Sequence, residues 1–96
     1  MDITTLEAKI EGYNDRDSMY IVGLNDDLED VTIYKQGLLD SIKNNSEISE
    51  QEYLAWSKMI ALEILENFNW QQVIVFYWFK DVLSHVTMKV SEDGIL

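Results

Sequence analysis

The chain has 96 residues, a formal net charge of −11 and no cysteine. A chain of this length holds one hydrophobic core, and its 47% of apolar residues argue against a disordered acidic tail. The missing cysteines exclude disulfides and thiolate metal sites, and the acidity argues against direct binding to nucleic acids or anionic membranes. We therefore expect a single acidic globular domain over residues 1–96.

The first predicted element is a short helix near the N-terminus. Apolar residues recur at helical spacing from Ile3 through Leu6 and Ile10. Thr4 is the predicted N-cap, with Glu7 at the reciprocal position of a capping box. Glycine is common just after a helix, so Gly12 is the expected stop. Residues 14–18 are polar and predict an exposed loop.

Residues 19–44 fit two structures. β-branched and aromatic residues over 19–24 and 31–36 are typical of two strands joined by an acidic turn. A helix from about 27 to 44 would instead align Leu28, Val31, Leu38 and Ile42 on one face. Its first turn would carry acidic residues, which the helix dipole favours. We favour the helix, although Gly37 weakens it.

The two remaining elements follow in the second half of the chain. Ser49-Glu50-Gln51-Glu52 is a capping box, and the residues after it predict a helix over 50–66. Residues 70–86 carry a broad apolar stripe at helical spacing, which favours a central core helix. The run Val73–Phe79 also has high strand propensity, and a terminal strand near 86–90 remains an alternative. The predicted fold is thus mainly α, a bundle of about four helices, with an α+β alternative in which a hairpin at about 19–36 packs on two C-terminal helices.

Catalytic and metal-binding patterns are missing from the sequence. No glycine-rich phosphate loop is present. His85 is the sole histidine, and Asp81 could orient it or share a metal with it, but two ligands do not make a zinc site. Neither Asp15-x-Asp17 nor the acids at 26–30 continue into the glycine and distal glutamate of a calcium-binding EF-hand loop. We therefore expect a protein that is not an enzyme and needs no metal or cofactor.

Charge and aromatic content divide the chain into two halves. Residues 1–52 hold thirteen acids and four bases, whereas residues 53–96 hold five acids and three bases. Eight of the eleven aromatic residues lie between Tyr53 and Phe79. A net charge of magnitude about 2–8 is enough to keep a small domain soluble, so the excess in the first half indicates a contact surface. The candidate partner-binding residues are Asp15, Asp17, Tyr20, Asp26, Asp27, Glu29, Asp30, Tyr34, Glu47, Glu50 and Glu52.

These features predict an inhibitor whose carboxylates imitate nucleic-acid phosphates. Carboxylates three or four residues apart on a helix lie about 5–6 Å from one another at Cβ, on the scale of successive phosphates, and arginine binds both groups bidentately. In composition the chain is similar to the DNA-mimic, anti-restriction and anti-CRISPR proteins of bacteriophages, which are small, acidic and free of cysteine. The similarity implies as partner a basic nucleic-acid-binding protein, such as a nuclease, in the cytoplasm of a bacterial host.

A different reading assigns the contact surface to the aromatic second half. The protein would then be an interaction subunit, an adaptor or an immunity protein that could form oligomers, and Trp56, Trp70 or Trp78 would anchor its partner. The N-terminal residues lack the basic and apolar regions of a signal peptide. We therefore expect a cytoplasmic protein under either hypothesis.

Overall fold

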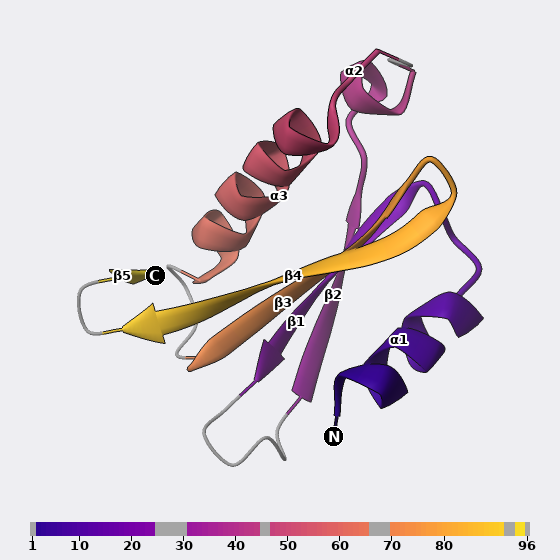
Figure 1. Ribbon diagram of the computed structural model, residues 1–96. Helices are drawn as coiled ribbons and strands as arrows, with labels where there is room; N and C mark the ends of the chain where they lie inside the picture. The colour runs from indigo at the N-terminus through magenta and orange to yellow at the C-terminus, as the bar shows by residue number, and fades with distance from the viewer. Residues whose placement is uncertain (1, 25–30, 45–46, 66–69, 92–93, 96) are drawn as a thin grey trace.

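The computed structural model describes residues 2–24, 31–44, 47–65, 70–91 and 94–95, and it shows an α+β fold (Figure 1). Its elements in chain order are α1 (Ile3–Gly12), β1 (Ser18–Leu24), β2 (Val31–Gly37), α2 (Asp40–Lys43), α3 (Glu50–Leu65), β3 (Gln72–Phe79), β4 (Val82–Ser91) and β5 (Gly94–Ile95). The strands form one antiparallel sheet in the order β2-β1-β3-β4, and the two-residue β5 pairs with the end of β4. The predicted helical bundle is therefore wrong.

The largest error concerns residues 70–86, which form a strand and the start of another in place of a core helix. β3 lies in the middle of the sheet, between β1 and β4, and its residues from Val73 to Trp78 are all buried. A strand that is buried on both faces shows no alternation of apolar and polar residues, so its apolar run resembles the stripe of a buried helix. The terminal-strand alternative near 86–90 agrees with β4.

Residues 19–44 contain a hairpin, so the favoured helix over 27–44 is also wrong. β1 and β2 pair antiparallel from Ser18↔Gly37 to Leu24↔Val31. Among the described residues of this region, 19–24 and 31–44, helical structure is limited to α2, a single turn. The β-branched residues of β2 outweigh the helical spacing, because they pack well on a half-buried strand. The α+β alternative had the hairpin in the right place, but it replaced the β3–β4 hairpin with a helix.

The sheet is covered by a helix on each face, and this arrangement creates two cores (Figure 1). On one face Leu6 and Ile10 of α1 pack against a cluster that includes Val22 and Phe76. On the other face Tyr53 and Ala61 of α3 pack against the alternate residues of β1 and β3, which point away from α1. Successive residues of a strand point to opposite faces, so β1 and β3 supply both cores. All seven residues of β1 are buried.

Both long helices begin at side-chain caps. The carboxylate of Asp2 accepts the backbone N–H of Thr5 at 2.8 Å, so Asp2 caps α1 and the prediction of Thr4 is wrong by two residues. This hydrogen bond also lowers the pKa of Asp2. At α3 the N–H of Glu52 donates to Ser49 Oγ at 3.2 Å, which confirms the predicted cap. No helix in the described ranges is both long and apolar enough to cross a membrane.

The outer side of β2 is an open edge of the sheet. β2 pairs with β1 along its whole length, and no other strand among the described residues pairs with it. Its outward N–H and C=O groups are therefore left without a strand partner. The opposite edge is formed by β4, whose end is extended by β5.

The β3–β4 turn consists of two residues that both have positive φ. Lys80 has φ 51° and Asp81 has φ 63°, and Phe79 pairs with Val82 across the turn. Two-residue turns of this kind suit the twist of a hairpin, but they favour Asn and Gly, because most side chains disfavour the left-handed region. The turn thus holds two residues in a conformation that costs stability.

Replacing this pair by Lys80→Asn with Asp81→Gly is expected to raise the free energy of unfolding by about 1 kcal/mol. The exchange also removes the exposed ion pair between Arg16 and Asp81, and such pairs contribute little. Urea unfolding measures the change. Arg16→Gln removes the same ion pair without changing the turn and serves as the control. A double variant no more stable than this control would contradict the prediction.

Candidate functional site

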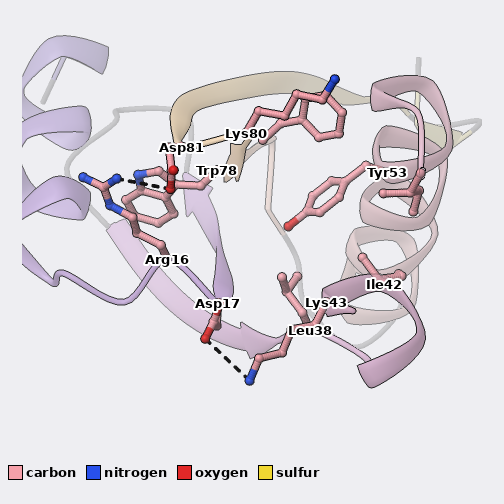
Figure 2. A pocket seen from close by; sticks show the side chains of 11 residues that line it. Arg16, Asp17, Leu38, Ile42, Lys43, Tyr53, Trp78, Lys80 and Asp81 are labelled. Carbon is pink, nitrogen blue, oxygen red and sulfur yellow. Dashed lines mark hydrogen bonds and ion pairs between the residues drawn. The ribbon is translucent and has the colours of Figure 1, made fainter. Parts of the chain in front are cut away.

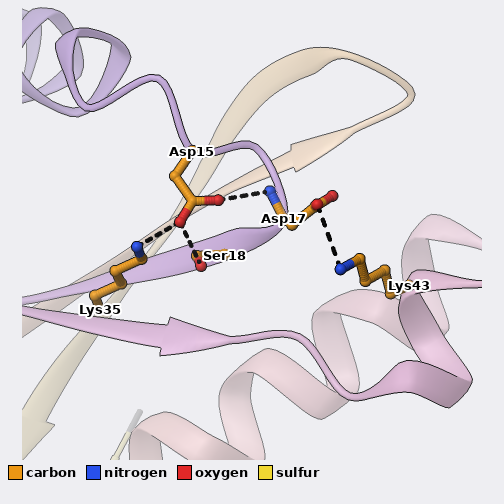
Figure 3. A network of polar contacts seen from close by, with 5 residues as sticks. All are labelled: Asp15, Asp17, Ser18, Lys35 and Lys43. Atoms are coloured by element: carbon orange, nitrogen blue, oxygen red, sulfur yellow. Dashed lines mark hydrogen bonds and ion pairs between the residues drawn. The ribbon is translucent and has the colours of Figure 1, made fainter.

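The loop before β1 carries the first two predicted contact residues, and both are engaged within the protein (Figure 3). The Asp15 carboxylate forms an ion pair with Lys35 of β2 and accepts hydrogen bonds from Ser18 Oγ and the N–H of Asp17, each at 3.2 Å. The hydrogen bond from Lys35 is the main cause of the lowered pKa of Asp15. Asp15 therefore fixes the start of β1 against β2 and presents only part of its charge to a partner.

Asp17 lies on the outer side of the same loop and reaches toward α2. Its carboxylate lies 3.5 Å from the ammonium of Lys43, and its side chain is 66% exposed. This contact joins the loop to the helical connection that leads into α3. Asp17 is thus available to a partner in a way that Asp15 is not.

The structure separates the two predicted tyrosine anchors. Tyr20 of β1 is 3% exposed and packs between Tyr13 and Trp78 on the α1 face, with ring centroids at 5.1 and 6.1 Å. Its ring therefore belongs to the core and has no free surface for a partner. Tyr34 of β2 lies half-buried on the opposite face, where its ring centroid is 5.3 Å from that of Trp70. The two tyrosines cannot contact one flat partner surface together.

The predicted acids near α3 lie at the start of that helix. Glu47, Glu50 and Glu52 are exposed, and Glu50 accepts a hydrogen bond from the hydroxyl of Tyr77 at 3.2 Å. Burial raises the pKa of Tyr77, and the hydrogen bond to Glu50 raises it further. Asp17 is joined to α2, which precedes this helix, through Lys43. The structure therefore brings Asp17 into the same region of the molecule as the acids of α3.

The remaining predicted acids, Asp26, Asp27, Glu29 and Asp30, lie outside the described residues. In the sequence they stand between Leu24 and Val31, which end β1 and begin β2 and pair with each other. Leu24 also pairs with Gln72, and Gln72 pairs with Lys89. These four paired residues form a row across one end of the sheet. Asp15 and Asp17 precede β1 and belong to the opposite end.

His85 contacts a different carboxylate from Asp81, the one that its position in the sequence suggested. His85 Nδ1 lies 3.2 Å from Glu7 Oε1 of α1, and its ring packs on Phe76 with centroids 5.7 Å apart. Asp81 contacts Arg16 at 3.4 Å. The predicted proximity of Asp81 and His85 assumed one turn of a helix, whereas the residues belong to a turn and a strand. Within the described parts of the chain no group of three potential metal ligands comes together.

The tryptophans of the second half are mostly inside the protein. Trp70 is 9% exposed and Trp78 is 8% exposed, and each belongs to one of the two cores. Trp56 is half-buried on α3. An aromatic contact surface in this half would therefore have to use residues that already pack against the sheet, and this weakens the support for the interaction-subunit hypothesis.

Comparisons with models of known protein families, with curated proteins and with solved structures found no match. The functional assignment therefore depends on the charge, burial and geometry of this chain.

Proposed function

We propose that this chain is a small acidic binding protein that occupies the basic groove of a nucleic-acid-binding protein and thereby excludes the nucleic acid. The observation that carries the proposal is the surplus of carboxylates. Eighteen acids face seven lysines and arginines, so most acids would remain uncompensated even if every base formed a separate ion pair. Basic grooves attract such a surface, and arginine forks bind carboxylates as they bind phosphates.

The arrangement of the described residues supports this proposal in two ways. The sheet is covered on both faces and β1 is fully buried, so charged groups are held on a rigid support, which lowers the entropic cost of binding. The acids of the α3 start are exposed. We place the action of the protein in the cytoplasm, where a nuclease or another nucleic-acid-binding protein would be its partner.

The test is capture of partners from a bacterial lysate with the immobilised protein, followed by elution with duplex DNA or RNA. We expect the captured proteins to be basic nucleic-acid-binding proteins that nucleic acid displaces. We also expect their affinity to fall by about tenfold or more between low and high salt, because exposed charge pairs are screened. Binding that persists unchanged from low to molar salt would contradict the proposal.

A matched pair of variants separates local contacts from net charge. Asp26→Lys with Asp27→Lys is expected to abolish capture, because it places cations against a basic groove. Glu11→Lys with Glu63→Lys changes the net charge by the same amount outside the predicted contact residues, and it should retain most of the binding. Equal losses in both variants would show that only the overall charge matters.

A further inference from the structure

A cavity of about 300 Å³ opens beside the β3–β4 turn, between the sheet, α2 and α3 (Figure 2). Its apolar wall includes Leu38 and Ile42 near α2, Tyr53 of α3 and Phe79 of β3. This volume lies at the lower end of the range of small-molecule sites, which are mostly apolar with a few placed polar groups. The cavity is thus large enough for a small organic molecule and far larger than one water requires.

A buried hydroxyl that has no hydrogen-bond partner among the described residues borders this cavity. Tyr53 is 3% exposed, and no partner for its hydroxyl is found among the described residues. Figure 2 shows the oxygen pointing away from α3, toward the space between the labelled lining residues. The ring is held by Tyr77, Trp56 and Phe79, whose centroids lie 5.3–6.2 Å away. Because buried polar groups are normally hydrogen-bonded, the site lacks one acceptor.

Cations are concentrated around the same cavity. Arg16, Lys43 and Lys80 line it together with two carboxylates, Asp17 and Asp81, although the chain has only seven lysines and arginines. Arg16 and Lys43 contact these carboxylates at 3.4 and 3.5 Å with exposed side chains, and Lys80 rests over the ring of Phe79. Exposed ion pairs are weak, so these cations are free to exchange their carboxylate for that of a ligand.

We propose that this cavity binds a small organic carboxylate with an apolar body. The apolar body of the ligand packs against Leu38, Ile42 and Phe79. Its carboxylate accepts a hydrogen bond from the hydroxyl of Tyr53 and faces the three cations at the rim of the cavity. Hydrogen-bond donors outnumber acceptors among the polar groups around the cavity. This excess favours a ligand that accepts hydrogen bonds over a cation. The negative charge of the whole protein opposes an anion at long range, but salt screens charges beyond about 8 Å. This site is independent of the proposed function.

The test is an NMR titration of the ¹⁵N-labelled protein with 3-phenylpropionate, with 3-phenylpropionamide as the neutral counterpart. We expect saturable shifts in the amides of Leu38, Ile42 and Lys80, and at least about tenfold weaker binding of the amide, because charge-assisted hydrogen bonds are about twice as strong as neutral ones. Tyr53→Phe removes an oxygen that has no partner in the described parts of the chain, so the variant should fold normally. It should bind the carboxylate about tenfold more weakly.

Two further variants test the role of the rim. Arg16→Gln with Lys43→Gln should weaken binding of the carboxylate and leave that of the amide unchanged. The control, Lys58→Gln with Lys89→Gln, removes two exposed cations elsewhere and should bind like the original protein. The proposal is overturned if millimolar 3-phenylpropionate produces no saturable shifts at the cavity, if the amide binds as tightly as the carboxylate, or if Tyr53→Phe leaves the affinity unchanged.

Discussion

Gly23→Ala is expected to lower the free energy of unfolding by about 2–3 kcal/mol, near the upper end of the usual cost of overpacking. Gly23 lies in β1, and the position that a Cβ atom would occupy is already filled by the indole ring of Trp70. The strand cannot shift to make room, because Gly23 is paired with Thr32 on one side and Val73 on the other. The ring is also confined by Tyr34. One added methyl group therefore displaces a buried tryptophan.

Urea unfolding measures this effect, and Gly12→Ala is the matched control. A Cβ atom at Gly12 meets nothing within 4 Å, and alanine is the better helix former, so this exchange at the end of α1 should be neutral or slightly stabilising. Trp70→Leu combined with Gly23→Ala should recover part of the loss, which a double-mutant cycle would show as coupling between the two positions. A Gly23→Ala protein as stable as the original would refute the close contact.

The protein is expected to lose about 2 kcal/mol of stability between pH 10 and pH 12 through Tyr53, and about 3 kcal/mol in all once the pH is well above 12. Burial raises the pKa of Tyr53 to about 12, and Tyr77 nearby contributes in the same direction. In this range the unfolded chain releases the phenol proton while the folded protein keeps it. The unfolded state then binds fewer protons, so stability falls as pH rises from the unfolded pKa of 10.0 to the folded value. Below pH 10 this contribution is fully present.

Urea unfolding at a series of alkaline pH values tests this prediction. Tyr53→Phe should flatten the decline, although part of it should remain because burial also raises the pKa of Tyr20 and of Tyr77. If Tyr53→Phe and the original protein lose stability in parallel, the hydroxyl of Tyr53 is not protected by burial.

Local signals in the sequence were enough to predict the two long helices. α3 runs over Glu50–Leu65 where 50–66 was expected, and the Oγ of Ser49 caps it by accepting the N–H of Glu52. α1 ends at Gly12 as predicted. These features depend on residues within one or two helical turns of each other. The start of α1 differed because Asp2 competes with Thr4 as a cap, and both residue types are suitable.

The sheet could not be predicted in the same way, because its pattern depends on distant neighbours. β3 has a continuous apolar run since β1 and β4 flank it and a helix covers each face. That environment is created by pairs such as Val22↔Ile74, which are far apart in the sequence. The hairpin over β1 and β2 was a recognised alternative, but helical spacing and strand propensity competed over the same residues.

The prediction of the contact residues was limited for the same reason, because their surroundings also depend on distant neighbours. The sequence shows that Asp15 and Tyr20 lie in an acidic half, but only the register of β1 against β2 reveals that Asp15 meets Lys35 and that Tyr20 is buried. The cavity at Tyr53 was missed altogether. It is formed by segments from four parts of the chain, and no local spacing indicates a buried hydroxyl without a partner.

The open side of β2 has a consequence for the behaviour of many copies in a concentrated solution. Unpaired N–H and C=O groups on an edge strand are a template for the same edge of another molecule, and natural proteins commonly use charge to prevent such pairing. At neutral pH the net charge of −11 keeps copies apart, whereas near the pI of about 4.2 this repulsion vanishes. We therefore expect copies of the chain to associate through the edge of β2 more readily near the pI than at neutral pH.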